Sequence, residues 1–320
     1  MAKPLLVGSI DGETLSFAVA GDHAPFALAG LKHFKTSEFA TFTDALQAYT
    51  RAQAIETNGL PFALAVAGVP RGDVITFANC RWYLSVSGIK AFLRTEPLLL
   101  NDFAASAWSL KAVTASDLTP IGGAAPRPPR PGRTFLVIGA GAGLGMATLA
   151  FADDGATVVL QSEGGHASFA AQSEKEDAVR AALRRKFGHV SFERLLSVPG
   201  FANIHAALGA PAPANGADVL QAALRRRDPA AIATVDLFAG ILGSFAGNGV
   251  LATGAWDGVF LLGGLLGDAL PLLKAGPFRA QFAAKGRMKR ALDAVPTSYV
   301  VGAQSALAGV AAAYRERRTA

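Results

Sequence analysis

Two segments of this chain share one layout, in which apolar runs flank short turns that contain glycine. The first is residues 5–20, LLVGSIDGETLSFAVA, and the second is residues 134–161, where TFLVIG, MATLAF and ATVVLQ are separated by glycine-containing turns. Apolar runs on both sides of such a turn are typical of β-hairpins. Helical periodicity follows each segment, so the sequence predicts an α/β protein in which a hairpin followed by helices occurs twice.

The length of 320 residues favours two domains, because single cores rarely grow beyond roughly 250 residues. With 51% apolar and 17% charged residues, the chain has ample material for buried cores. Its 30 basic and 24 acidic side chains suit anionic small molecules as well as nucleic acid. The arginines form no known nucleic-acid motif, so no nucleic-acid partner is predicted.

The cysteine content and the apolar segments indicate in which cellular compartment the protein is found. Cys80 is the only cysteine, which excludes an intrachain disulfide and fits a reducing compartment. No leader-like segment opens the chain, and the longest apolar region, residues 258–276, is interrupted by Asp268 and Pro271 before it could span a bilayer. We therefore expect a cytoplasmic protein without a membrane partner.

The first hundred residues alternate between extended and helical patterns. A helix is predicted to begin at Thr41 or Thr43 and to end at Gly59. Strands are predicted at 5–8, 15–20, 62–67 and 74–77. This alternation is typical of an α/β lobe.

The rest of the chain is predicted to be mostly helical outside the second hairpin segment. A helix near 103–112 precedes residues 122–133, GGAAPRPPRPGR, which are predicted to form an exposed loop because proline interrupts helices and central strands. Beyond Gln172 the pattern is helical almost to the end, with one buried strand within 256–264.

The second hairpin segment also has features of a dinucleotide-binding motif. Gly139, Gly143 and Gly145 follow a strand, and a second strand ends near Glu163, where a ribose-binding acid would lie. A nicotinamide-dependent dehydrogenase of the short-chain type would also need a tyrosine with a lysine four residues later, and no tyrosine here has one. The Asp-Asp-Gly before the last run favours a hairpin turn over a helix.

Acids, an amide and an imidazole lie on predicted turns in both halves of the chain. Asn101 and Asp102 follow a strand-like LLL, Glu163 and His166 lie in EGGH, and Glu193 lies in GHVSFERLLSVPG. Each sugar hydroxyl both donates and accepts hydrogen bonds, so this set suits a polyol ligand. A cleft between two lobes is the natural place for it.

Each of these residues also has a purely structural interpretation. Asn101 or Asp102 could cap the helix that follows, since both residue types are good N-caps. The Gly-Gly before His166 could simply form a turn, and Glu193 could be a solvated residue. A capping box from Ser191 does not explain Glu193, because the acid would have to lie one residue later.

Several stretches of the sequence, in their order and spacing, resemble the bacterial glucokinase family, in the actin-like sugar-kinase superfamily, and together they cover nearly the whole chain. The matching stretches include FANCRW, LLLNDFAASAW, GAGAGLG, EGGHASFA, GHVSFERLLSVPG, GSFAGN, DGVFLLGG and FRAQFAAKGR. The resemblance implies an α/β, two-lobed actin-like ATPase (ribonuclease H-like) fold with a cleft between the lobes. It further implies a small domain at 1–108, completed by a C-terminal helix at 303–320, and a large domain at 109–302.

The resemblance also implies which residues hold the sugar. Asp102 would be the base that takes the proton from the 6-hydroxyl of glucose, because a carboxylate serves this role in phosphoryl transfer. Asn79 is a further candidate for the sugar site, or else a turn residue. The implied glucose-binding residues are Asn101, Asp102, Glu163, His166 and Glu193.

The first hairpin turn departs from the family. There the turn reads Asp-x-Gly-Gly-Thr-Asn and faces the phosphates and magnesium of ATP. Here Ser9 replaces the Asp, Asp11 the first Gly, Glu13 the Thr and Thr14 the Asn, so that only Gly12 agrees. The resemblance implies that Ser9, Gly12 and Thr14 are the phosphate-side residues of this turn.

The acids in this turn have opposite consequences for ATP and for magnesium. A carboxylate ~4 Å from a phosphate charge costs on the order of 4 kcal/mol at an effective dielectric constant of 20, so Glu13 should weaken ATP binding. Alternatively Glu13 turns to solvent, or Asp11 or Glu13 recruits Mg²⁺ in place of the missing Asp. The turn is therefore either a relocated metal site or the mark of a lost activity.

Two other glycine turns are assigned to the nucleotide by the resemblance. The second phosphate turn is Gly141-Ala142-Gly143, where the family has Gly-Thr-Gly, so its hydroxyl is missing. Gly263 and Gly264 follow a buried strand where the family packs backbone against adenosine. A packing role at a strand-to-helix turn is the structural alternative.

The main hypothesis is therefore a kinase that phosphorylates glucose, or a close hexose, at the 6-hydroxyl with Mg-ATP and altered nucleotide handling. The first alternative is an inactive sugar-binding or regulatory pseudokinase, and the second is the dehydrogenase. The sequence leaves the oligomeric state open, a homodimer included.

Overall fold

The computed structural model describes residues 3–11, 13–23, 26–77, 82–211, 215–226, 228–302 and 306–319. Gly12 and Asn79 lie outside these ranges. The chain groups into two compact units. Unit 1 comprises Met1–Val113 and Ala303–Ala320, and unit 2 comprises Thr114–Gly302.

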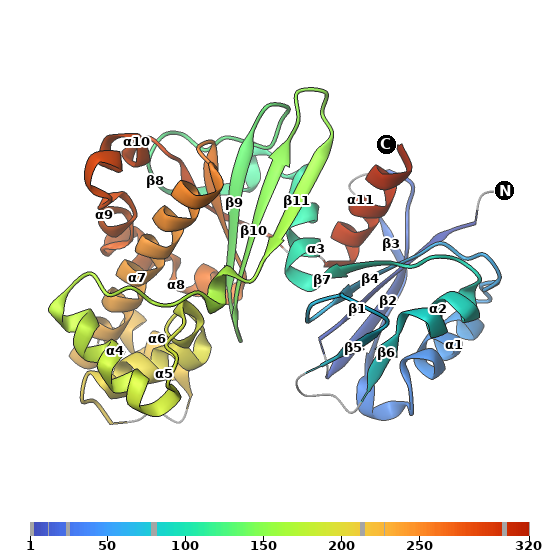
Figure 1. Cartoon of the computed structure of the whole chain (residues 1–320), viewed down its shortest axis with the longest axis horizontal. Helices are drawn as coiled ribbons and strands as arrows, with labels where there is room; N and C mark the ends of the chain where they lie inside the picture. Colours follow the sequence, from blue (N-terminus) through green and yellow to red (C-terminus); the bar gives the residue numbers. More distant parts are fainter. Residues whose placement is uncertain are drawn as a thin grey trace. The chain divides into compact units, whose positions relative to one another are not determined.

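Unit 1 is built on a five-stranded sheet with the order β3-β2-β1-β4-β7 (Figure 1). The first predicted hairpin is confirmed, since β1 and β2 pair antiparallel from Leu5 opposite Ala20 to Ile10 opposite Leu15. β1, β4 and β7 run parallel. A separate pair, β5–β6, completes the strands of this unit. The strands are β1 (Leu5–Ile10), β2 (Thr14–Ala20), β3 (Leu28–Lys35), β4 (Phe62–Val66), β5 (Val74–Thr76), β6 (Tyr83–Ser85) and β7 (Leu98–Asn101).

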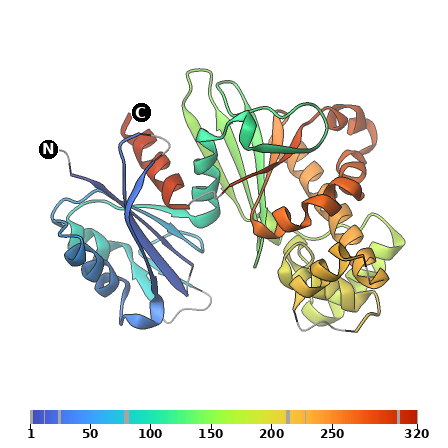
Figure 2. The same ribbon diagram turned by 180° about the vertical axis from the view of Figure 1, so that it is seen from behind.

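Helices cover both faces of the unit 1 sheet (Figure 1, Figure 2). α1 (Phe42–Ala52) and α2 (Val86–Leu93) pack on the face that carries the large side chains of β1, β2 and β4. α3 (Asp102–Ser109) and α11 (Ala306–Thr319) pack together on the other face. α11 approaches α3 so closely that a Cβ on Gly309 would lie 1.7 Å from the Ala105 carbonyl oxygen.

The helix predicted from Thr41 or Thr43 forms, but it is shorter than expected. Thr41 is its N-cap and forms a capping box with Asp44. The helix ends at Ala52 and not near Gly59, because Ala54 takes a left-handed conformation with φ of 52° that an α-helix cannot continue.

Unit 2 is built on a six-stranded sheet with the order β11-β10-β9-β12-β13-β8. β9, β10 and β11 form an antiparallel meander, as the sequence predicted, whereas β9, β12 and β13 run parallel. The second predicted hairpin segment therefore contains two successive hairpins. The strands are β8 (Leu118–Gly122), β9 (Thr134–Ala140), β10 (Leu144–Phe151), β11 (Thr157–Ser162), β12 (Gly258–Leu262) and β13 (Thr297–Val300).

The prediction of a single strand beyond Gln172 is wrong, because β13 follows β12. The reason is chemical: β13 reads TSYV, and its Thr297 and Ser298 are polar yet completely buried, so no apolar run marks the strand. The Thr297 hydroxyl donates to the Gly122 carbonyl 3.0 Å away, which satisfies it. The predicted loop at 122–133 is confirmed from Gly123 onward, since Gly122 ends β8.

The helices of unit 2 pack around a large apolar core (Figure 2). Among the described residues, α7 is the one helix long and apolar enough to cross a bilayer, but 72% of its most apolar stretch is buried among α5, α6, α9 and β9. It is the core helix of this unit. The helices are α4 (Glu174–Phe187), α5 (Val198–Ala207), α6 (Gly216–Leu224), α7 (Pro229–Thr253), α8 (Gly264–Ala275), α9 (Phe278–Ala283) and α10 (Lys289–Asp293).

The dinucleotide-binding interpretation of residues 137–163 is wrong. That motif needs a helix after the glycine turn. Here β9 turns directly into the antiparallel strand β10, with Ala140 opposite Leu144, and β10 turns into β11.

Candidate active site

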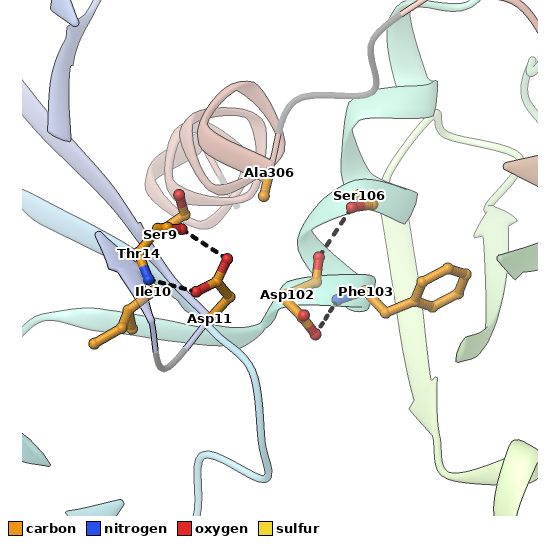
Figure 3. A pocket seen from close by; sticks show the side chains of 8 residues that line it. All are labelled: Ser9, Ile10, Asp11, Thr14, Asp102, Phe103, Ser106 and Ala306. Carbon is orange, nitrogen blue, oxygen red and sulfur yellow. Dashed lines mark hydrogen bonds between the residues drawn. The ribbon is translucent and has the colours of Figure 1, made fainter. Parts of the chain in front are cut away.

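The carboxyl ends of two parallel strands in unit 1 lie beside one cavity. β1 ends at Ile10 and β7 ends at Asn101, with β4 between them. In sheets of this kind, ligands bind outside the carboxyl ends of the strands. The cavity measures about 250 Å³, and Figure 3 shows the side chains around it. It is lined by Ser9, Ile10, Asp11, Thr14, Asp102, Phe103, Ser106 and Ala306.

Asp11 organises the turn between β1 and β2. Its Oδ1 accepts the backbone N–H groups of Glu13 (3.0 Å) and Thr14 (2.7 Å), and its Oδ2 accepts the Thr14 hydroxyl (2.7 Å). Partial burial would raise the pKa of Asp11, but these hydrogen bonds outweigh it and hold the pKa below its ordinary value. The acid therefore has the turn-forming role that Asp commonly has.

Asn101 and Asp102 lie at the first turn of α3. The Asn101 side chain caps the helix by accepting the N–H groups of Phe103 (2.9 Å) and Ala104 (3.1 Å), so the capping interpretation of Asn101 is confirmed. Its amide donates to the Gly68 carbonyl, which fixes its orientation. Asp102 accepts the Phe103 N–H through Oδ1 (2.7 Å) and presents its carboxylate to the cavity (Figure 3).

The donors around this cavity suit a magnesium ion carried by a nucleotide. Mg²⁺ typically takes one or two carboxylates and otherwise phosphate and water oxygens. Asp11 and Asp102 supply two carboxylates, and Ser9 and Thr14 supply hydroxyls. The described residues contain no group of three acids, histidines or cysteines that could hold a metal by themselves. Glu13 is exposed and is not among the described residues that line the cavity, so Asp11 is the better of the two predicted metal candidates.

In unit 2, Glu193 contacts the turn between β9 and β10. It lies in the 3-10 helix η5 (Phe192–Arg194). Its Oε2 accepts the backbone N–H of Leu144 at 3.0 Å, directly after the predicted phosphate turn that ends at Gly143. Its Oε1 lies 3.9 Å from His166 Nδ1. Glu193, which the resemblance assigned to the sugar, therefore lies at the end of the turn that the resemblance assigned to phosphate.

Glu163 precedes the short 3-10 helix η4 (Gly164–His166) and His166 is its last residue, and both side chains are exposed. The turn that carries them needs glycine at one position, because a Cβ on Gly165 would lie 2.2 Å from the Leu144 carbonyl oxygen. The loop bearing His166 is thus pressed against the start of β10. The Gly-Gly pair forms a turn, as the structural interpretation held, and that turn brings His166 toward Glu193.

Gly263 and Gly264 form the exposed turn between β12 and α8. Gly263 has φ of 93°, a conformation that favours glycine, so the pair lies at a strand-to-helix turn as predicted. A packing role is not supported at Gly264, because no described atom lies within 4 Å of where its Cβ would be. Sequence reasoning missed Tyr299, whose hydroxyl donates to the Gly263 carbonyl at 3.4 Å. Burial and the neighbouring Asp268 raise the pKa of Tyr299, so the hydroxyl remains protonated.

The structure thus brings the predicted site residues together in groups within each unit. Ser9, Asp11, Thr14 and Asp102 share the unit 1 cavity. Glu193 joins His166 to the glycine turn in unit 2. Ser106, four residues after Asp102 on the same helix face, was not predicted and lines the cavity as well.

Comparison with known proteins places this arrangement in a family. The model of the family described as Glucokinase matches residues 6–317. A glucokinase from Stenotrophomonas maltophilia (strain R551-3) is 37% identical over 97% of this chain and 95% of its own length. A glucokinase from Xanthomonas campestris pv. campestris (strain B100) is 37% identical with the same coverage of both chains.

Comparison with solved structures also finds sugar kinases. The glucokinase from an Antarctic psychrotroph superposes with a TM-score of 0.84 at 29% identity, covering 98% of this chain and 99% of that one. The ROK hexokinase from Thermus thermophilus, at 16% identity, has a TM-score of 0.67 over 99% of this chain and 100% of its own, which shows the common fold.

The fold is therefore that of the actin-like sugar kinases. Within that class, the chain belongs to the glucokinase family. The resemblance noted in the sequence is confirmed.

Proposed function

We propose that this protein is an ATP-dependent hexose kinase that phosphorylates glucose, or a close hexose, at its 6-hydroxyl. The observation that carries the proposal is the unit 1 cavity, where the carboxylate of Asp102 and the hairpin turn built by Asp11 line the same space. Phosphoryl transfer needs an acceptor for the proton of the attacking hydroxyl close to the phosphate-binding groups. Relatives described as glucokinases support the choice of reaction.

In this proposal Asp102 accepts the proton of the 6-hydroxyl as the hydroxyl oxygen bonds to the γ-phosphorus. The bond between the γ-phosphorus and the β–γ bridging oxygen breaks, and ADP leaves with that oxygen. The N–H of Phe103, which donates to Asp102, keeps the carboxylate oriented. Asn101, Glu163, His166 and Glu193 bind the sugar hydroxyls, with Asn79 as a further candidate.

The phosphate groups of ATP are proposed to contact backbone at the glycine turns. The candidates are Ser9, Gly12 and Thr14 in unit 1, and Gly141, Ala142 and Gly143 in unit 2. Gly263 and Gly264 are proposed to contact the adenosine of ATP. When bound, magnesium would neutralise phosphate charge. Asp11 is the residue proposed to hold it, directly or through water, because it lines the cavity and its Oδ2, which accepts the Thr14 hydroxyl, has a further lone pair for a metal or water.

The family's metal-side Asp is Ser9 here, and this observation favours one alternative, an inactive sugar-binding pseudokinase. A hydroxyl is a weaker magnesium ligand than a carboxylate. The exposed position of Glu13 favours the active enzyme, since its charge is screened by solvent there. Cytoplasmic location and homodimer formation remain predictions.

Calorimetric titration with glucose and with Mg-ATP, followed by a coupled glucose 6-phosphate assay, tests the proposal. The kinase predicts binding of both ligands and turnover. Glucose binding without turnover would identify the pseudokinase, and the double variant Ser9→Asp, Glu13→Thr should then raise activity sharply. No glucose binding at all would contradict the assignment of the sugar site.

A further inference from the structure

The two oxygens of the Glu193 carboxylate contact different parts of unit 2. Oε1 lies 3.9 Å from His166 Nδ1, on the side of the proposed sugar-binding residues. Oε2 accepts the Leu144 N–H at 3.0 Å, on the side of the glycine turn. An ideal Cβ on Gly143 would lie only 2.7 Å from this same oxygen, so the carboxylate is packed directly against the turn.

The turn at Gly141–Gly143 has few other means of holding its conformation. Two of its three residues lack side chains, and no atom lies within 4 Å of where a Cβ on Gly141 would be. One hydrogen bond, from the Gly141 N–H to the Gly143 carbonyl, closes the turn on itself. Because glycine is the most flexible residue, contacts from outside must fix the turn.

Among the described residues, the hydrogen bonds that reach the turn from outside come from one short segment. The Val198 N–H donates to the Gly141 carbonyl at 2.8 Å, at the start of the turn, whereas the Glu193–Leu144 bond lies just after its end. The Ser197 hydroxyl donates to the Glu193 carbonyl oxygen at 2.8 Å and accepts the Gly200 N–H, which anchors the segment to α5. Residues 193–198 therefore hold the turn at both ends.

From this geometry we infer that Glu193 is a positioning residue for the phosphate turn and couples sugar binding to nucleotide binding. The inference rests on the proposed function. A sugar hydroxyl that donates to Oε1 would order the carboxylate while Oε2 keeps the Leu144 N–H. The nucleotide then meets a turn that is already ordered, so each ligand raises affinity for the other.

The first test needs no ligand. Amide hydrogen exchange at Leu144 should be slow in the wild-type protein and clearly faster in Glu193→Ala, whereas Glu193→Gln, which keeps an acceptor oxygen, should restore protection. Gly143→Ala, which displaces the carboxylate, should also speed this exchange, and the matched Gly141→Ala should not. Unchanged exchange at Leu144 in Glu193→Ala would overturn the positioning role.

The second test is nucleotide binding without sugar, measured by titration with Mg-ADP. Glu193→Ala should raise the Kd for Mg-ADP about fivefold or more, within the usual range of coupling between sites. His166→Gln, which removes the partner of Oε1 alone, should weaken glucose binding and leave the sugar-free Kd for Mg-ADP unchanged. In the wild type, saturating glucose should lower that Kd, and in Glu193→Ala it should not.

The outcomes separate this inference from the proposed function. A Glu193→Ala variant that loses only glucose affinity, with sugar-free Mg-ADP binding intact, would overturn the coupling while leaving the kinase proposal standing. A wild type that binds neither glucose nor Mg-ADP would contradict the proposed function and the coupling with it, and Leu144 exchange would still decide the positioning role. Thermal midpoints of all variants control for folding.

Discussion

The two glycine turns that the proposal assigns to phosphate are held in different ways. The β1–β2 turn in unit 1 is held by its own residue, because Asp11 accepts three hydrogen bonds from Glu13 and Thr14. The β9–β10 turn in unit 2 is held by Glu193, which is 49 residues from Leu144 in the sequence. The first turn is a local structure, whereas the second depends on how the whole unit packs.

The difference predicts where each turn is vulnerable. A turn held by its own side chain should lose its conformation only when that side chain is changed, and the loss should stay within the turn. A turn held by a residue distant in the sequence should lose its conformation when any change displaces that residue. Such a change should also disturb the proposed sugar-binding residues, because Glu193 is one of them.

The largest effect on the second turn is expected from Gly165→Ala. The new Cβ would meet the Leu144 carbonyl oxygen at 2.2 Å, and a backbone atom cannot yield as a flexible side chain can. We expect a loss of about 1–3 kcal/mol in the free energy of unfolding, measured by urea denaturation. Wild-type stability in this variant would show that the loop bearing His166 is not pressed against β10.

A smaller effect is expected for the first turn in Asp11→Ala. This change removes the acceptor for three hydrogen bonds, two of them from backbone N–H groups, and should cost about 1–2 kcal/mol because the turn is exposed to water. Urea denaturation of Asp11→Ala and Asp11→Asn measures it. Asparagine keeps an acceptor, so a loss as large as that of alanine would contradict the turn-forming role.

The pH dependence sharpens the comparison further. The pKa of Asp11 is lower in the folded state than its ordinary value, so its ionised form stabilises the protein above about pH 4, and this contribution is lost as pH falls through the folded pKa. The stability advantage of wild type over Asp11→Asn should therefore shrink between pH 6 and pH 3. A constant difference across that range would contradict the pKa direction.

The smallest effect on stability is expected from Gly143→Ala. Here the new Cβ meets the end of the flexible Glu193 side chain, which can move aside, so the free energy of unfolding should change by less than about 1 kcal/mol. Denaturation curves for Gly143→Ala and Gly141→Ala should nearly coincide, although only the former displaces Glu193. A large loss in Gly143→Ala would show that the carboxylate is rigidly held.

Features that depend on neighbouring residues were predictable from the sequence. The first hairpin, the cap at Thr41 and the helix after Asn101 all follow from local turn, capping and periodicity rules. β13 was missed because its buried residues are polar, and their partners lie far away in the chain. The end of α1 was placed too late because a left-handed alanine leaves no mark in the sequence.

The same distinction between local and long-range features applies to the candidate site. The types and order of the site residues could be recognised, and Asp11 could be suspected as a turn residue. The shared cavity of Asp11 and Asp102 could not be predicted from local patterns, because it arises only when β1 and β7 join one sheet. The contact of Glu193 with Leu144 could not be predicted either, because it arises only when η5 packs against the β9–β10 turn. The individual roles of the sugar-binding residues remain predictions.

The central claim, that Asp102 is the base of a glucose kinase, is tested most directly by the rate of glucose 6-phosphate formation in Asp102→Asn. Asparagine keeps an acceptor for the Phe103 N–H, so the start of α3 should remain intact. We predict a fall in kcat of about 10²–10⁴-fold with glucose affinity within a few-fold of wild type. A variant that turns over within tenfold of the wild-type rate would contradict the account.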